Sequence, residues 1–374
     1  MNGRERILLT FQGGIPDKVP VFEQSVAGAV VSEILGRSAL GFASDVHYHE
    51  AQSRLAGASA YEDFIGRWKE DYAAFVRALD MDMVAAPWFL WETPVRRLDE
   101  FAFLYRNEDG EYVRSYEPRS QTFSLARAEC GVNTNALRAK IRKTLREDNG
   151  QNYDGGYWAL LKWLIEIFGN ERCVAGASFF AIPMRADWLM LLLEDAGLVR
   201  EYLDFVAERD VDAIRKQAEM GVRVFNGGGD LAANSGPLYS PALFREVALP
   251  GLKKIIASAH SRDGFYIFRT DGNIRAMEDL LFEEAGADAY GEIDIDAGMD
   301  LIELRRRRPQ LVLWGGLACG SLLLNGAERE IVNEARRLRN ALRSGGRWIF
   351  ASSNTLLPGT NTRGYLAALR EVRQ

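Results

Sequence analysis

The stretch Gly264-Phe-Tyr-Ile-Phe-Arg-Thr-Asp-Gly-Asn-Ile-Arg275 decides how the fold of this chain is interpreted. Residues 265–268 form a short apolar run of aromatic and β-branched side chains, which predicts a buried strand. Asp271-Gly-Asn273 ends that run, and 274–284 has the amphipathic pattern of a helix. Barrel enzymes carry their chemistry at this strand-to-helix corner. The alternative is a plain turn in which Asn273 caps the helix.

The same strand-then-helix pattern recurs along the chain and predicts an α/β fold. The chain contains eight short apolar runs, and nearly every one is followed by a helical pattern. The runs begin at Val19, Met81, Arg172, Val222, Phe265, Ala287, Leu311 and Arg347. Eight such units favour a (β/α)8 barrel over an open doubly wound sheet. No Gly-x-Gly-x-x-Gly follows the first run, so a dinucleotide site is not indicated.

We expect a single barrel domain over 1–374. Two segments of it, a helical cap and a β-hairpin, are additions to the simple barrel. The pattern of 26–79 is helical throughout and predicts a helical cap before the second strand. A β-hairpin is expected over 101–116, with its loop at 107–110. Further expectations are two helices over 185–219 broken at Gly197 and one continuous helix over 241–260.

Composition excludes several classes of function. The 374 residues carry a formal net charge of −6, which argues against a nucleic-acid-binding surface. No apolar run approaches the roughly 20 residues of a membrane-spanning helix, and the short apolar stretch at the N-terminus makes a secretory signal unexpected. Three widely spaced cysteines suit a reducing cytoplasm. His47 and His49 fall on different helix faces and do not form an i, i+4 metal pair.

A barrel brings the ends of all its strands to one mouth, which defines the candidate site. We expect Asp230, Asp271 and Arg269 to be the catalytic residues. The polar and aromatic residues expected to bind substrate are Gln24, Trp88, Trp91, Phe179, Phe180, Asn234, Glu292 and Asn354. The aromatic side chains at these strand ends could instead pack over the hydrophobic core without binding a ligand. Gly227-Gly-Gly229 could likewise be an ordinary flexible turn.

An ordered series of motifs resembles the uroporphyrinogen decarboxylase superfamily. Its members in this chain are Arg4-Glu-Arg6, Gly14-Ile-Pro-Asp-Lys-Val-Pro-Val21, Gly229-Asp230, Ser240-Pro241 with Phe244, Leu249-Pro250, Thr270-Asp-Gly-Asn-Ile274, Gly298-Met-Asp300, Leu313-Trp-Gly-Gly316 and Gly345-Gly346. The series spans nearly the whole chain. The resemblance implies a distorted (β/α)8 barrel with an N-terminal helical extension. The superfamily holds porphyrinogen decarboxylases and corrinoid-linked methyltransferases, including zinc-dependent methyl carriers and aryl-methyl-ether demethylases.

The chain departs from both of these branches. Porphyrinogen decarboxylases carry an arginine-rich segment after the first strand, where this chain has Phe22-Glu-Gln-Ser-Val-Ala-Gly28. An acidic loop would repel a polycarboxylate. The zinc-dependent methyltransferases use His-x-Cys after the fifth strand and a cysteine after the eighth. Arg269, Asp271 and the neighbourhood of Asn354 stand at the matching positions, so we expect no zinc site and assign no metal ligands.

The resemblance favours a corrinoid-linked methyltransferase-like enzyme. Its methyl donor is expected to be small, either aromatic or not, and seated by aromatic side chains. It implies no tightly bound cofactor, and a corrinoid (cobalamin) delivered by a partner corrinoid protein. Two alternatives stay open: a decarboxylase of a small acid or uroporphyrinogen-like substrate, and a ligand-binding barrel without catalysis. Whether the chain forms a homodimer is also open. Its partners are expected to include neither nucleic acid nor a membrane.

Overall fold

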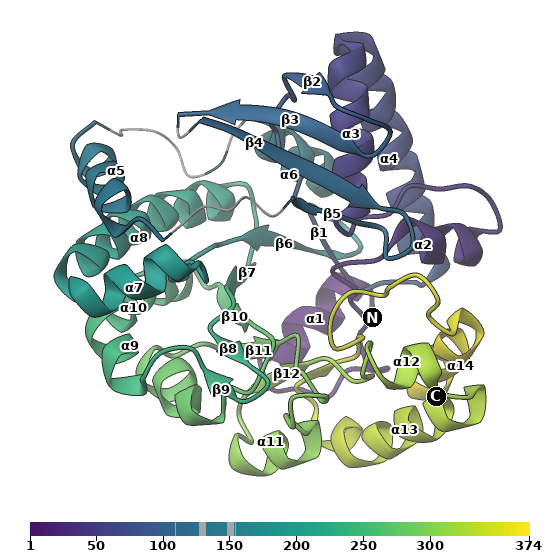
Figure 1. The fold of residues 1–374 in the computed structure, drawn as a ribbon. Helices are drawn as coiled ribbons and strands as arrows, with labels where there is room; N and C mark the ends of the chain where they lie inside the picture. The colour runs from purple at the N-terminus through teal and green to yellow at the C-terminus, as the bar shows by residue number, and fades with distance from the viewer. Residues whose placement is uncertain (109, 127–131, 148–152, 154) are drawn as a thin grey trace.

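The computed structural model describes residues 1–108, 110–126, 132–147, 153 and 155–374, and its centre is a curled parallel sheet (Figure 1). Seven strands follow one another in the order β1-β6-β7-β10-β11-β12-β13. Their bounds are β1 Met83–Ala85, β6 Cys173–Ala177, β7 Val224–Gly228, β10 Phe265–Arg269, β11 Ala289–Gly291, β12 Val312–Trp314 and β13 Trp348–Ile349. All six pairings are parallel. The fifth predicted strand, 265–268, is β10.

The eighth position of the barrel is occupied by the segment around Val21. Val21 forms an isolated parallel bridge with Phe350, and its carbonyl accepts a hydrogen bond of 2.8 Å from the backbone N–H of Asp82. This segment therefore joins β13 to β1 and confirms the distorted (β/α)8 barrel. It is a bridge where a strand was predicted, because Pro20 has no N–H to donate to a neighbouring strand.

Helices surround the sheet in the expected alternation. Their bounds are α1 Gly3–Phe11, α6 Gly155–Phe168, α7 Ala186–Glu194, α8 Ala196–Glu219, α9 Pro241–Val247, α10 Leu249–His260, α11 Leu301–Arg307, α12 Leu322–Asn325, α13 Glu328–Leu342 and α14 Thr362–Val372. None of the helices in the described ranges is long and apolar enough to cross a bilayer. Side chains fill the barrel, with Phe11 stacked on Phe265 at 4.9 Å and Phe22 against Trp314 at 5.0 Å between ring centroids.

Three helix predictions were wrong in detail. The break in 185–219 falls at Asp195, whose side chain accepts a hydrogen bond from the backbone of Leu198 and caps α8. The segment 241–260 is two helices, since Pro250 lies in the first turn of α10 and cannot continue α9. Residues 274–284 contain a 3₁₀ turn at Arg275–Met277 followed by a π-helix at Asp279–Glu284.

The N-terminal additions form a separate layer against one side of the barrel (Figure 1). The predicted helical cap consists of α2 Gly28–Leu35, α3 Asp45–Ala56 and α4 Ala58–Ala78. The predicted hairpin is the centre of an antiparallel sheet, with β2 Arg96–Arg97, β3 Ala102–Asn107, β4 Gly110–Glu117 and β5 Thr122–Leu125. Residue 109 of its loop lies outside the described residues. The sequence also predicts a loop over 147–152, and residues 148–152 of it likewise lie outside the described residues.

Candidate active site

The candidate residues gather at the carboxyl ends of the barrel strands. Arg269 ends β10 and lies between Gly228 of β7 and Gly291 of β11 in the strand register. A Cβ atom on Gly228 would lie 2.6 Å from the carbonyl oxygen of Arg269, so this close approach requires glycine. Glu292 follows β11 with a positive φ of 59°, which is uncommon outside glycine. The two strands thus present Arg269 and Glu292 side by side.

Arg269 is paired inside the mouth. Its guanidinium nitrogen Nη1 lies 3.0 Å from Oε2 of Glu292, and the two side chains are 16% and 7% exposed. The other oxygen of Glu292 accepts a hydrogen bond of 3.4 Å from the amide of Gln24. The amide of Asn226 in turn donates to Oε1 of Gln24 at 2.5 Å. Burial raises the pKa of the Glu292 carboxyl even though Arg269 opposes this effect.

Asp271 lies in the same mouth and is bound by Asn354. The Nδ2 atom of Asn354 donates to Oδ2 of Asp271 at 2.9 Å, across 83 residues of sequence. Burial is the main cause that raises the pKa of Asp271, and the nearby carboxylates of Asp230 and Asp294 raise it further. Asp230 and Asp271 therefore lie at the same end of the barrel, close enough to interact electrostatically.

Two aromatic rings line the rim beside these charges. Trp88 and Phe179 meet edge to face at 5.4 Å and stay 48% and 43% exposed. The guanidinium carbon of Arg269 lies 5.5 Å from the centre of the Trp88 ring. The cap supports this rim: the Trp88 carbonyl is hydrogen-bonded to His47, and Glu50 accepts from the backbone of Leu90 at 2.8 Å.

The remaining predicted site residues lie elsewhere. Trp91 packs edge to face on Phe89 at 5.2 Å and fills the space beside Gly156. Phe180 is 3% exposed and lies against Gly251 of α10, within the core. Asn234 lies in the exposed turn between two short strands, β8 Ala232–Ala233 and β9 Gly236–Pro237. The structure therefore brings together Gln24, Trp88, Phe179, Asp230, Arg269, Asp271, Glu292 and Asn354.

A buried carboxyl group lies behind Asn354, at a predicted strand end to which the sequence assigned no catalytic or binding role. Glu23 is 2% exposed and accepts hydrogen bonds from the Ser352 backbone at 2.8 Å, the Ser352 hydroxyl at 2.7 Å and the Tyr365 hydroxyl at 2.8 Å. Burial raises the pKa of Glu23 to about 7. Glu23 thus ties the first segment of the barrel to the last, next to the residue that holds Asp271.

We expect Glu23 to make folding stability depend on pH. Because its pKa is higher in the folded chain than in the unfolded one, its protonated form stabilises the fold, and this contribution is lost as pH rises from about 4.5 to 7. The loss should amount to about 3 kcal/mol. Urea unfolding of the wild type and Glu23→Gln across this range should show a pH-dependent difference of that size. Glu62→Gln, at an exposed position of α4, is the control; equal pH profiles for wild type and Glu23→Gln would contradict the assignment.

The His-x-Cys and cysteine ligand set of the zinc-dependent methyltransferases does not fit this mouth. The described part of the chain holds no group of three or more His, Cys, Asp or Glu side chains placed to bind a metal ion. Arg269 occupies one of the positions concerned and is paired with Glu292. Cys319 receives a hydrogen bond of 3.5 Å from the Ser353 hydroxyl, and burial raises the pKa of its thiol, which disfavours the thiolate that binds metals.

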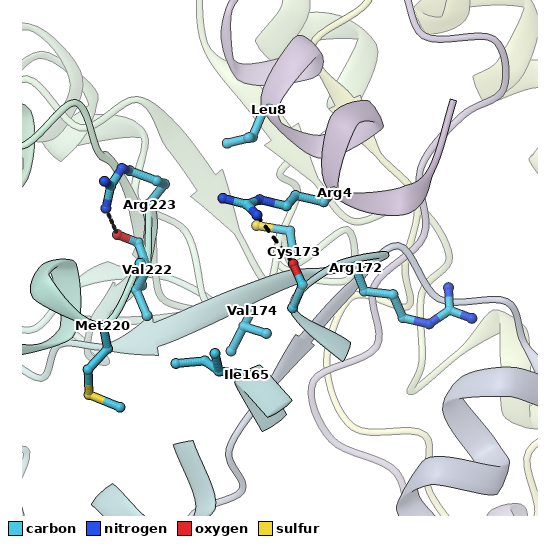
Figure 2. Close-up of a pocket in the computed structure, with 11 residues that line it drawn as sticks. Arg4, Leu8, Ile165, Arg172, Cys173, Val174, Met220, Val222 and Arg223 are labelled. Atoms are coloured by element: carbon cyan, nitrogen blue, oxygen red, sulfur yellow. Dashed lines mark hydrogen bonds between the residues drawn. The ribbon is translucent and has the colours of Figure 1, made fainter. Parts of the chain in front are cut away.

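A cavity of about 90 Å³ lies at the opposite end of the barrel (Figure 2). Its lining includes Arg4, Cys173 and Arg223, near the beginnings of β6 and β7. Arg4 donates to the Gly169 carbonyl at 3.3 Å and Arg223 to the Val222 carbonyl at 2.8 Å. Residues at the amino-terminal end of a barrel usually serve stability. Arg4 joins α1 to the residue after α6, whereas Arg223 bonds the carbonyls of its chain neighbours Val222 and Ala218. The mouth at the other end of the barrel is therefore the candidate site.

Comparisons with known proteins give a family model and, over the whole chain, a solved structure of similar fold. A family model described as uroporphyrinogen decarboxylase (URO-D) matches residues 181–374. No curated protein matches the sequence. Among solved structures, a methyltransferase from Methanosarcina mazei aligns with a TM-score of 0.64 and 16% identity, covering 100% of this chain and 98% of that one. A D-psicose 3-epimerase from Clostridium cellulolyticum H10 aligns with a TM-score of 0.35 and 11% identity, over 63% of this chain and 90% of its own.

Proposed function

Because the chain belongs to the uroporphyrinogen decarboxylase family, we propose that it is an enzyme that transfers a methyl group from a small donor to a corrinoid carried by a partner protein. The observation that carries the proposal is the pairing of Arg269 with Glu292 inside an acidic mouth. The solved methyltransferase that covers the full length of this chain is consistent with it.

The charges of the mouth disfavour the decarboxylation of an acid. Such a substrate needs a cation to hold its carboxylate, and the guanidinium of Arg269 already bonds Glu292. Asp230 and Asp271 would repel the carboxylate of such a substrate, because like charges in a partly buried site interact strongly. A methyl donor without a carboxylate avoids both costs.

The residues of the mouth supply what a methyl donor requires. The rings of Trp88 and Phe179 offer an apolar surface against which the donor can lie. Asp271, oriented by Asn354, can hold the electropositive end of the donor or give a proton to its leaving group. The corrinoid, when brought by its carrier, supplies the nucleophile that accepts the methyl group. This chain binds the donor, orients it and limits the access of water.

A methyl-transfer assay tests the proposal. The purified chain is mixed with reduced free cobalamin and a panel of methyl donors that includes aryl methyl ethers and methylamines, and methylcobalamin is followed by its absorbance. We expect transfer with the wild-type chain and no transfer with heat-denatured protein. Release of CO2 from a small acid in the absence of methyl transfer would instead favour the decarboxylase, and neither reaction would favour a barrel that only binds its ligand.

A further inference from the structure

We propose that the methyl donor is an N-methylated ammonium cation that keeps at least one N–H. This inference rests on the proposed function and names its substrate class. It comes from three features of the mouth: an excess of carboxylates, a buried acceptor that lacks a donor, and exposed aromatic faces.

The carboxylates of the mouth outnumber its cations. The Asp271 carboxylate is repelled electrostatically by Asp230 and Asp294. The Glu292 carboxylate is repelled by Asp230 and Asp271. Arg269 is the cation that acts on both Asp271 and Glu292, and its guanidinium bonds Glu292 at 3.0 Å. Negative charge is costly to keep in a partly buried site without a counter-charge. A cationic ligand would supply that counter-charge.

Asn226 provides an independent indication of what the ligand carries. It is 8% exposed, and in the described part of the chain its Oδ1 atom has no hydrogen-bond donor. Its orientation is set by its neighbours. The Glu292 carboxylate can only accept from Gln24, which therefore directs its Nε2 at Glu292 and its Oε1 at Asn226.

This arrangement leaves Asn226 as an acceptor within the mouth. Its Nδ2 must donate to Gln24, so its Oδ1 is the atom that remains. A buried acceptor without a donor is rare in folded proteins. An N–H of the ligand would satisfy it, whereas an ether or a quaternary ammonium ion has no hydrogen to donate.

The aromatic rim favours an organic cation over a metal ion. Trp88 and Phe179 are both large, exposed and in contact with each other, and Trp88 already has a guanidinium near its face. Aromatic faces attract ammonium groups through their quadrupole, while a metal ion needs converging oxygen, nitrogen or sulfur ligands. Within the described ranges, no such set of three His, Cys, Asp or Glu side chains occurs.

Methyl transfer from such a cation to a corrinoid requires no proton source. The C–N bond breaks, its electron pair stays on nitrogen, and the amine leaves uncharged. The methyl group forms its new bond with the electron pair of a reduced corrinoid, the acceptor of the proposed function. In this reaction Asp271 serves to hold the cation and has no proton to deliver.

Calorimetric titration of the whole chain, without corrinoid, tests the inference with three ligands of similar shape. They are N,N-dimethylbenzylammonium, which has an N–H, benzyltrimethylammonium, which has none, and the neutral benzyl methyl ether. We expect the first to bind about tenfold more tightly than the second and the ether to bind most weakly. Asn226→Leu should remove the difference between the two cations, while Asn226→Asp should retain it.

Asn333→Leu, an exposed position on α13, is the matched control, and thermal unfolding of each variant establishes that it is folded. Equal binding of the ether and the cations would overturn the inference, as would an unchanged preference in Asn226→Leu or saturation of the site by Zn2+ or Mg2+ alone. Methyl transfer from an aryl ether without cation binding would overturn it and leave the proposed function standing. Selective cation binding without methyl transfer would support the ligand class and refute the proposed function.

Discussion

Asp271→Asn is expected to lower kcat/KM for methyl transfer by about 100-fold or more, with little change in the melting temperature. The substitution keeps the shape of the side chain and its contact with Asn354, and it removes the negative charge. The neutral amide can neither balance a cationic donor nor deliver a proton to a leaving group. The cobalamin assay gives the rate, and thermal unfolding gives the stability of the variant.

The pH profile of the wild type separates the two roles of Asp271, whose pKa is raised by burial. If Asp271 holds a cation, the rate should fall as pH drops through that pKa. If it protonates a leaving group, the rate should fall as pH rises through it. The profile should flatten in Asp271→Asn in either case. Asp279→Asn, at an exposed position of the π-helix, serves as control. Full activity of Asp271→Asn would place the chemistry elsewhere.

The sequence predicted those parts of the molecule that depend on local pattern. Phe265–Arg269 is a strand because apolar residues run without interruption and are then stopped by Asp271 and Gly272. Eight such runs lead to a barrel, and a barrel brings strand ends together. That logic is sufficient to expect Asp271 near Asn354 although they are 83 residues apart. It would also have indicated Asn226, a polar residue at a predicted strand end.

Side-chain direction and long-range partners could not be predicted in this way. Phe179 and Phe180 are neighbours in sequence, yet one faces the rim and the other the core, and a loop has no fixed periodicity that separates them. Trp91 has a positive φ of 59°, and its backbone N–H donates a hydrogen bond to the side-chain carboxylate of Glu50, so its ring lies away from the mouth. Glu50 lies in α3, where polar residues are buried beside apolar ones, so nothing in the sequence marks its contact with this loop.

The ion pair between Arg269 and Glu292 leads to a prediction about stability. Arg269→Ala should destabilise the fold by about 3–5 kcal/mol, because it leaves the Glu292 carboxylate buried without its partner. Urea unfolding at pH 7 measures the free energy of unfolding. Arg245→Ala is the matched control, since Arg245 pairs with Glu284 at the surface and is 55% exposed. Because solvent screens this exposed pair, its loss should change the free energy of unfolding much less than Arg269→Ala does.

The double variant Arg269→Ala/Glu292→Gln tests whether the unpaired Glu292 carboxylate causes the loss of stability in Arg269→Ala. Replacing the carboxylate by a neutral amide removes the charge, and the amide oxygen at position 292 would still be able to accept a hydrogen bond from Gln24. We therefore expect the double variant to be more stable than Arg269→Ala by about 2 kcal/mol or more, within the coupling that pairs in contact show. If the two variants unfold at the same urea concentration, Arg269 stabilises the mouth by its contact with Trp88 and not by compensating the charge of Glu292.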